Sequence, residues 1–448
     1  MSVELSAEQR AVFEYIESTR DHVFITGRAG TGKSTLLNHL AWNTDKQVVI
    51  CAPTGVAALN VGGQTIHSLF RLPIGLIADA DLRQGPETRK LLNTMDTLVI
   101  DEVSMVNADL LDAIDRSLRK ARGRQFEAFG GVQVVMFGDP YQLPPVPGDA
   151  DERAYFTDHY RSLWFFDARV WLEAELHIIE LATVHRQRDD AFAAMLTAVR
   201  HGRVTADIAN RLNEAGARPA PDDAITLATR NDTVAKINKA ALDRLPGKTK
   251  TAKADVNGDF GGRNFPADEA LELKPGAHVM FLRNDPDQRW VNGTLGVVQT
   301  IRDTVWVDVD GESFEVQPSV WEKFRYSYDA DKKELKKDTV GEFQQFPLRL
   351  AWAVTIHKSQ GSTYDRAMID LGNRVFSAGQ TYVALSRLTS LDGLFLSRPL
   401  RPSDIIVDLD VRRFMSEAPR IVATQLEAPK PEAPKPDAPK PDAPEPDA

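Results

Sequence analysis

The stretch Gly27-Arg-Ala-Gly-Thr-Gly-Lys-Ser34 decides the fold. It follows the apolar run VFIT of residues 23–26 and opens the helical pattern STLLNHLAW of residues 34–42. This is the strand, loop and helix context that a phosphate-binding loop requires. Glycines let the backbone wrap a chain of phosphates, and amide hydrogens at a helix N-terminus supply positive potential. In such a loop Lys33 reaches the β- and γ-phosphates and Ser34 ligates magnesium. The sequence therefore predicts a nucleoside triphosphate site.

A second motif supplies two carboxylates at the end of another apolar run. Residues 98–100 (LVI) are followed by Asp101 and Glu102. We expect Asp101 to hold magnesium through Ser34 and water, and Glu102 to polarise the attacking water. Together with the phosphate loop, this pair predicts a nucleoside triphosphatase.

A third motif follows the apolar run of residues 132–137. Residues 137–145 read FGDPYQLPP, a rigid turn that brings Gln142 near the end of the expected sheet. Gln142 is interpreted either as a sensor of the γ-phosphate or as a capping glutamine in a proline turn.

The order of apolar runs predicts an α/β fold in two lobes. Short runs separated by amphipathic stretches indicate parallel sheets with crossover helices. Residues 273–346 instead carry short β-rich runs with glycines between them, which predicts a small inserted β-barrel. The apolar runs are residues 23–25, 48–51, 98–100 and 132–137 in the first lobe, and 225–229, 367–371 and 394–397 in the second.

Composition excludes several protein classes. The chain has 448 residues, 54 Lys and Arg against 64 Asp and Glu, a formal net charge of -10 and a single cysteine, Cys51. One cysteine cannot form an internal disulfide or a cysteine-based zinc site, which argues against a disulfide-stapled secreted protein and a structural zinc protein. No apolar run approaches the roughly 18 residues of a spanning helix, and the N-terminus does not resemble a secretory signal. We therefore expect a soluble protein of a reducing compartment.

The C-terminal segment, residues 427–448, repeats Ala-Pro-Lys-Pro and acidic residues without a large apolar side chain. Such a segment cannot bury enough surface to offset its ordering entropy. We expect an extended disordered tail, acting as an inert spacer or as the binding site of a protein partner.

Three more motifs follow later in the chain. Arg186 and Arg387 each come after an apolar run, in LATVHR and YVALSR, and residues 352–361 (WAVTIHKSQG) lie between them. Over residues 5–399 this order resembles the superfamily 1 DNA helicases. Residues 109–120 (DLLDAIDRSLRK), followed by residues 129–133 (FGGVQ), resemble the Pif-type (petite integration frequency) group of superfamily 1B.

The resemblance implies an architecture. It implies two RecA-like lobes, a wedge insertion in the first, an SH3-like barrel in the second, and 5′-to-3′ movement along single-stranded DNA. The implied domains are 1–70 and 97–180 for the first lobe, 71–96 for the wedge, 181–272 and 347–426 for the second lobe, 273–346 for the SH3-like insertion, and 427–448 for the tail.

The resemblance also implies roles for individual residues. Gln9 resembles the glutamine that reads adenine, although LSAEQ also predicts a capping box between Ser6 and Gln9. Arg186 and Arg387 resemble two arginine fingers. The expected catalytic residues are Lys33, Asp101, Glu102, Gln142, Arg186 and Arg387; the nucleotide-binding residues are Gln9, Gly27, Gly30, Thr31, Gly32, Lys33, Ser34 and Thr35; the magnesium ligands are Ser34 and Asp101; and the DNA contacts are Pro53, Thr54, Thr65, His67, Thr355, His357, Lys358 and Ser359.

The activity that the resemblance implies is ATP-dependent DNA unwinding with ATP and Mg²⁺ between the lobes. The implied location is a bacterial-type cytosol, in association with the nucleoid. The expected partners are single-stranded DNA and forked or 5′-tailed duplexes, bound by a monomer in DNA repair, recombination, replication or telomere maintenance. Three alternatives stay open: a translocase that strips proteins without unwinding, a P-loop switch that does not act on DNA, and a RecD-like or RNA-directed motor of the same superfamily.

Overall fold

The computed structural model describes residues 5–426 apart from 74, 147, 187–188, 261–264, 288, 330–333 and 424–425. The expected tail, residues 427–448, lies outside this part of the chain. The predicted α/β fold with parallel sheet cores is confirmed. Within the described residues, each helix is too short or too polar to cross a bilayer.

The first lobe is built on a seven-stranded sheet in the order β21-β6-β1-β5-β4-β2-β3, and every neighbouring pair is parallel. Its inner strands are buried on both faces, which explains their continuous apolar runs. The strands are β1 (His22–Gly27), β2 (Val48–Ala52), β3 (Gln64–Thr65), β4 (Thr97–Ile100), β5 (Gln133–Phe137), β6 (Leu176–Leu181) and β21 (Arg420–Val422).

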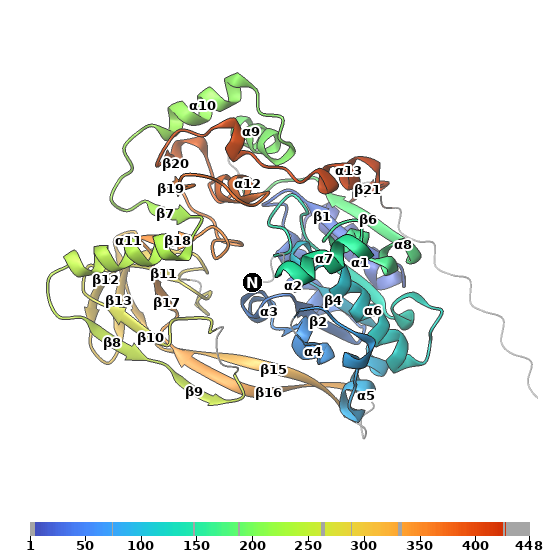
Figure 1. The fold of residues 1–448 in the computed structure, drawn as a ribbon. Helices are drawn as coiled ribbons and strands as arrows, with labels where there is room; N and C mark the ends of the chain where they lie inside the picture. Colours follow the sequence, from blue (N-terminus) through green and yellow to red (C-terminus); the bar gives the residue numbers. More distant parts are fainter. Residues whose placement is uncertain are drawn as a thin grey trace, which may run out of the picture.

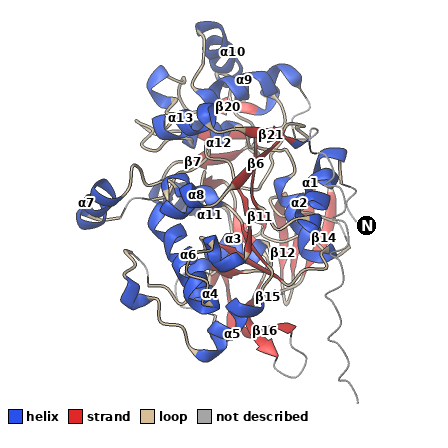
Figure 2. Ribbon diagram, turned by 90° about the vertical axis from the view of Figure 1, so that its right-hand side faces the viewer, coloured by secondary structure: helices blue, strands red, loops and turns tan. Residues whose placement is uncertain are grey.

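Helices cover both faces of this sheet. Helices α1 and α2 pack on the face that carries Val23 and Ile25, whereas α6 and α8 pack on the face that carries Phe24. Figure 2 shows these two pairs of helices on opposite sides of the central strands. The helices are α1 (Ala7–Ser18), α2 (Lys33–Asn43), α3 (Gly55–Asn60), α4 (Ile66–Phe70), α5 (Pro86–Thr94), α6 (Ala108–Arg122), α7 (Ala150–His159), α8 (Arg169–Glu173) and α13 (Leu409–Glu417).

The second lobe has a four-stranded parallel sheet in the order β18-β7-β19-β20. Three of its strands are the apolar runs predicted at residues 225–229, 367–371 and 394–397. The strands are β7 (Ile225–Ala228), β18 (Ala353–Thr355), β19 (Ala367–Asp370) and β20 (Leu394–Leu396), with helices α9 (Asp190–His201), α10 (Ala206–Gly216), α11 (Asn231–Arg244) and α12 (Gln380–Leu385).

A β-rich region is inserted between β7 and β18. Its main element is a five-stranded antiparallel sheet in the order β14-β13-β12-β11-β17, around a core that includes Trp290 and Phe281. Short strands pair beside it as β8 with β10. The bounds are β8 (Lys250–Lys253), β9 (Asp255–Gly258), β10 (Ala270–Leu273), β11 (His278–Phe281), β12 (Leu295–Ile301), β13 (Val305–Val309), β14 (Glu312–Val316) and β17 (Leu348–Leu350).

A long hairpin leaves this region. Strands β15 (Ser319–Asp329) and β16 (Glu334–Gln345) pair with each other, and β16 also pairs with β9, in a three-stranded sheet apart from the five-stranded one. Figure 1 shows the hairpin running from the β-rich region to α5 in the first lobe. The Gln64 side-chain amide donates a hydrogen bond to the Phe324 carbonyl at 2.7 Å. These residues were expected within the inserted β-barrel of residues 273–346, and the long hairpin that leaves it was not predicted.

The last strand departs from the expected domain division. Residues 347–426 were expected in the second lobe, but β21 pairs with β6 at the edge of the first sheet. Arg420 forms an ion pair with Glu180 at 2.9 Å, and Phe414 on α13 stacks on Phe166 of the first lobe. The chain therefore returns to the first lobe after completing the second, a pairing that a strand of three residues could not reveal from sequence.

Candidate nucleotide site

The phosphate loop, residues 27–34, lies between β1 and α2. Gly27, Gly30 and Gly32 have φ values of 152°, 84° and 78°, a region that side-chain-bearing residues rarely adopt. A Cβ on Gly32 would lie 2.2 Å from the Gln9 side-chain nitrogen. The Lys33 ammonium folds back over the loop and donates to the carbonyls of Gly27 (2.7 Å) and Arg28 (3.2 Å).

Three other residues predicted to bind the nucleotide lie in the same loop or in the first turn of α2. Thr31 is buried and its hydroxyl donates to the Arg28 carbonyl at 3.0 Å. Ser34 is exposed and Thr35 half-buried in the first turn of α2. The structure thus brings all the predicted loop residues together at the N-terminus of one helix.

Gln9 serves two structural purposes. Its side-chain oxygen accepts from the Ser6 amide at 2.9 Å, which confirms the predicted capping box of α1. Its side-chain nitrogen donates to the Gly32 carbonyl at 3.1 Å. Gln9 therefore ties the first helix to the phosphate loop, whereas its reading of adenine stays a prediction.

The acidic pair lies at the carboxyl end of β4. Burial, assisted by the negative charge of Glu102, raises the pKa of Asp101 to about 7 against the opposing charge of Lys33. Burial likewise raises the pKa of Glu102, and the positive charges of Lys33 and Arg387 oppose that shift. Glu102 therefore lies in the field of a lysine from the first lobe and an arginine from the second.

The two arginines are close enough to repel each other. Arg387 is buried and donates to the carbonyls of Val383, Ser359 and Ser362 and to the Ser386 hydroxyl. Arg186 donates to the Ser386 carbonyl at 3.2 Å. Burial, with the charge of Arg387 adding to it, lowers the pKa of Arg186 to about 9. Among the described residues no carboxylate lies within ion-pair distance of either guanidinium, so the pair favours an anion between the lobes.

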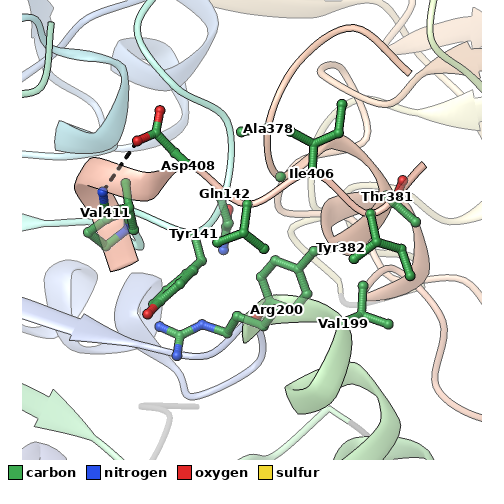
Figure 3. Close-up of a pocket in the computed structure, with 14 residues that line it drawn as sticks. Tyr141, Gln142, Val199, Arg200, Ala378, Thr381, Tyr382, Ile406, Asp408 and Val411 are labelled. Atoms are coloured by element: carbon green, nitrogen blue, oxygen red, sulfur yellow. Dashed lines mark hydrogen bonds between the residues drawn. The ribbon is translucent and has the colours of Figure 1, made fainter. Parts of the chain in front are cut away.

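Gln142 lies at the junction of the lobes. It is buried, and its backbone amide donates to the Asp139 carbonyl at 2.9 Å. A narrow pocket here is lined from both lobes by Tyr141, Gln142, Arg200 and Tyr382 (Figure 3). The structure therefore brings Gln142 near the second lobe without giving its side chain a hydrogen bond to it among the described residues.

Sequence reasoning missed three residues at this junction. Asp139 accepts from Arg200 at 2.8 Å, and both side chains are buried. The Ala29 amide donates to the Tyr382 hydroxyl at 2.9 Å. Asp139 and Tyr382 stood inside the motifs FGDPYQLPP and YVALSR without an assigned role, whereas Arg200 lies in a helical pattern that carries no motif.

Three of the predicted DNA contacts are threonines that cap short turns. The hydroxyls of Thr54, Thr65 and Thr355 accept from the amides of Ala57, Ser68 and Lys358, respectively. Each threonine follows or ends a parallel strand, namely β2, β3 and β18. They therefore lie at the carboxyl edges of the two sheets.

The remaining predicted contacts differ in exposure. Pro53, His67 and His357 are half-buried and Lys358 is exposed, whereas Ser359 is fully buried. Burial lowers the pKa of both histidines, which favours their neutral forms. The Ser359 hydroxyl donates to the Ile356 carbonyl, and the Ser359 carbonyl accepts from Arg387. The structure thus places Ser359 behind Arg387 rather than on the surface.

The chain is similar to known helicases over most of its length. The family model described as PIF1-like helicase matches residues 4–210. The ATP-dependent DNA helicase Pif1 of Bdellovibrio bacteriovorus is 35% identical over 429 residues, covering 93% of this chain and 92% of that protein. The human ATP-dependent DNA helicase PIF1 is also 35% identical, but this chain spans 66% of its length.

Solved structures of Bacteroides sp Pif1 are similar in fold. The complex with ADP-AlF4 has a TM-score of 0.86 at 37% identity, covering 92% of this chain and 97% of that one. The unliganded protein gives 0.85 at 37% identity, covering 93% and 98%. The form bound to ssDNA gives 0.67 at the same identity, covering 94% and 100%. The arrangement of this chain is therefore nearer to that of the ADP-AlF4 complex and of the unliganded protein than to that of the ssDNA-bound form.

Proposed function

This chain belongs to the PIF1-like helicases, and we propose from that premise that it uses ATP hydrolysis to move 5′ to 3′ along single-stranded DNA and to unwind the duplex ahead. The observation that carries the proposal is the buried ion pair between Asp139 of the first lobe and Arg200 of the second, at 2.8 Å, which joins the lobes at the nucleotide site. A site that needs side chains from both lobes couples hydrolysis to their closure, which is what a motor requires.

We assign the nucleotide to the phosphate loop. Lys33 would hold the β- and γ-phosphates, and the amides of residues 27–34 would surround them. The Ser34 hydroxyl and the Asp101 carboxylate would hold Mg²⁺, because both are hard oxygen ligands of the kind that this ion prefers. An ion held by Ser34 and Asp101 would supply positive charge that offsets the negative charge of the phosphates.

The hydrolytic roles follow from the charges around the site. Glu102 would orient and polarise the attacking water, and Gln142 would contact the γ-phosphate region. Arg186 and Arg387 would stabilise the charge that develops on the transferred phosphoryl group. An arginine finger is worth about 10³ to 10⁵ in rate. Hydrolysis would thus be slow until the lobes close.

We place single-stranded DNA across the carboxyl edges of both sheets, where ligands of open α/β sheets bind. Pro53, Thr54, Thr65 and His67 would contact it from the first lobe, and His357 and Lys358 from the second. Thr355 and Ser359 are buried, so we assign them to positioning that turn and Arg387. Phosphate contacts of this kind carry little sequence preference.

We assign residues 71–96 as the wedge that separates the strands. This segment lies on α6, where the Ile77 amide donates to Asp109 and the Leu82 carbonyl accepts from Lys120. We assign residues 273–346 as the SH3-like insertion, from which the β15–β16 hairpin reaches α5. Roles in repair, recombination or replication follow from the family alone.

The test is steady-state ATP hydrolysis with and without single-stranded DNA, together with unwinding of duplexes that carry a 5′ or a 3′ overhang. Lys33→Ala is the control that should abolish both activities. We expect DNA to stimulate hydrolysis and only the 5′ overhang to support unwinding. DNA-independent hydrolysis would refute the motor, and unwinding from the 3′ overhang would refute the polarity.

A further inference from the structure

A tyrosine of the second lobe contacts the backbone of the phosphate loop. The Tyr382 hydroxyl, from α12, accepts the Ala29 amide at 2.9 Å. The residues are 353 positions apart in sequence, and the contact is buried. Phosphate-loop amides are the groups that cradle a nucleotide's phosphates. Tyr382 therefore controls the orientation of one peptide of that loop from the opposite lobe.

The same hydroxyl reaches a buried ion pair. It donates to the Asp139 carboxylate at 3.5 Å, and Asp139 is held by Arg200 of α9 at 2.8 Å. Arg200 also lies over the Tyr141 ring, 4.3 Å from its centroid. Burial alone would lower the pKa of Arg200, but the Asp139 carboxylate outweighs it and raises that pKa. The Tyr382 hydroxyl thus donates its hydrogen bond to a carboxylate that Arg200 holds in place.

Helix α12 is docked on the first lobe at a second point. Gly379, which precedes the helix, has φ of 75°, and a Cβ there would lie 2.1 Å from the Gln142 carbonyl. Arg387 follows the same helix five residues after Tyr382, and its guanidinium donates to the Val383 carbonyl of α12. Whatever sets the position of α12 against the phosphate loop therefore also sets the position of Arg387.

We propose that Tyr382 is a positioning residue of the ATPase: its hydroxyl, held between the Ala29 amide and Asp139, aligns α12 so that Arg387 reaches the transferred phosphoryl group. The inference rests on the proposed function and names a residue that the site assignment did not include. Burial, with Asp139 adding to it, raises the pKa of Tyr382 to about 12. The hydroxyl therefore stays protonated at neutral pH and can donate its hydrogen bond to Asp139.

The test is Tyr382→Phe, which keeps the ring and removes the hydroxyl. We expect DNA-stimulated kcat to fall about tenfold, the loss that one buried hydrogen bond predicts, while KM for ATP changes less than about twofold because the interaction acts in the transition state. Rates are expressed per site titrated with a fluorescent nucleotide, so partly unfolded protein does not enter the comparison.

A matched control is Tyr160→Phe. The Tyr160 hydroxyl is also buried and donates to a carboxylate, that of Asp112 at 2.9 Å, but within the first lobe and away from the phosphate loop. We expect it to lower the unfolding midpoint as much as Tyr382→Phe and to leave kcat unchanged. A fall in kcat of similar size in both variants would overturn the proposal.

A double-mutant cycle with Arg387→Ala tests the route of the effect. If Tyr382 acts through Arg387, Tyr382→Phe should change the residual rate of Arg387→Ala by less than about twofold, since coupled sites are not additive. A further tenfold loss in the double variant overturns the proposal. So does a Tyr382→Phe variant with a raised KM at unchanged kcat, or one without an unfolding transition. Failure of the proposed function itself would differ, because the unsubstituted protein would then lack DNA-stimulated hydrolysis.

Discussion

The Asp101 carboxyl has a pKa near neutrality because burial and Glu102 both disfavour its charge. The folded state therefore binds a proton here that the unfolded chain releases at about its ordinary pKa of 3.8. Stability falls as pH rises through the interval between these two values, since the folded state then binds more protons than the unfolded state.

Asp101→Asn removes this proton uptake. We expect the free energy of unfolding of the original protein to fall between about pH 4 and pH 7 more steeply than that of the variant, with similar slopes above pH 8. Urea unfolding at each pH measures both curves. Parallel curves across the whole range would show that Asp101 titrates normally.

Gly32→Ala tests the conformation of the phosphate loop. The residue needs φ of 78°, which costs a side-chain-bearing residue about 1–2 kcal/mol, and its Cβ would meet the Gln9 side chain at 2.2 Å. We expect KM for ATP to rise by about tenfold or more.

The matched control is Gly85→Ala, since Gly85 has φ of -67° and a Cβ there meets nothing within 4 Å. In steady-state kinetics this variant should have the same KM for ATP as the original protein. Equal KM values for the two variants would contradict the strain argument.

Sequence patterns identified the local parts of the site and missed the contacts between lobes. The phosphate loop was predictable because glycine spacing, strand and helix are contiguous in the chain. Asp139 and Arg200 lie 61 residues apart, and Ala29 and Tyr382 lie 353 apart. Neither pair leaves a periodic signal, because each partner looks like a core or turn residue until the lobes meet.

At the scale of elements, helix α6 organises the first lobe through three buried carboxylates. Asp109, Asp112 and Asp115 accept the amides of Ile77 (3.0 Å), Val170 (3.0 Å) and Phe129 (2.6 Å), respectively. The three amides belong to different segments, since Ile77 lies in a loop, Val170 in the first turn of α8 and Phe129 in a 3-10 turn. From the sequence alone, residues 109–120 serve only as a family signature, whereas the structure gives the spacing of their acidic residues a physical reason.

Asp115→Ala should destabilise the first lobe by about 1–3 kcal/mol, because the Phe129 amide would stay buried without an acceptor. Phe129 has φ of 53°, so its loop depends on such support. Asp115→Asn keeps an acceptor oxygen and should lose less. Glu175→Ala, at an exposed position, serves as the control in the same denaturation experiment, and an equal loss there would contradict the assignment.

At the scale of the whole molecule, β21 closes the first sheet with residues from the far end of the sequence. Its three residues pair with β6, and Ala423 and Leu426 pack on the core formed by α1 and α2. This long-range pairing is also why the domain boundaries drawn from the sequence differ from the sheets observed.

A chain that stops after Glu417 should have a Tm lower by about 5 °C, on the scale of 2–4 °C per kcal/mol for a protein of this size. A chain that stops after Leu426 keeps β21 and should unfold at the original temperature. Differential scanning calorimetry compares the two. Equal midpoints would mean that β21 adds nothing to the first lobe.

The pairing of β21 with β6 can form only late in biosynthesis. Arg420 leaves the ribosome 240 residues after its partner Glu180, which at roughly 5–20 residues per second is about 12–48 s. Throughout that interval the nascent first lobe presents an unpaired strand edge, the kind of surface that recruits foreign strands. Slow translation or a nascent-chain chaperone would therefore affect the yield of this protein more than its final stability suggests.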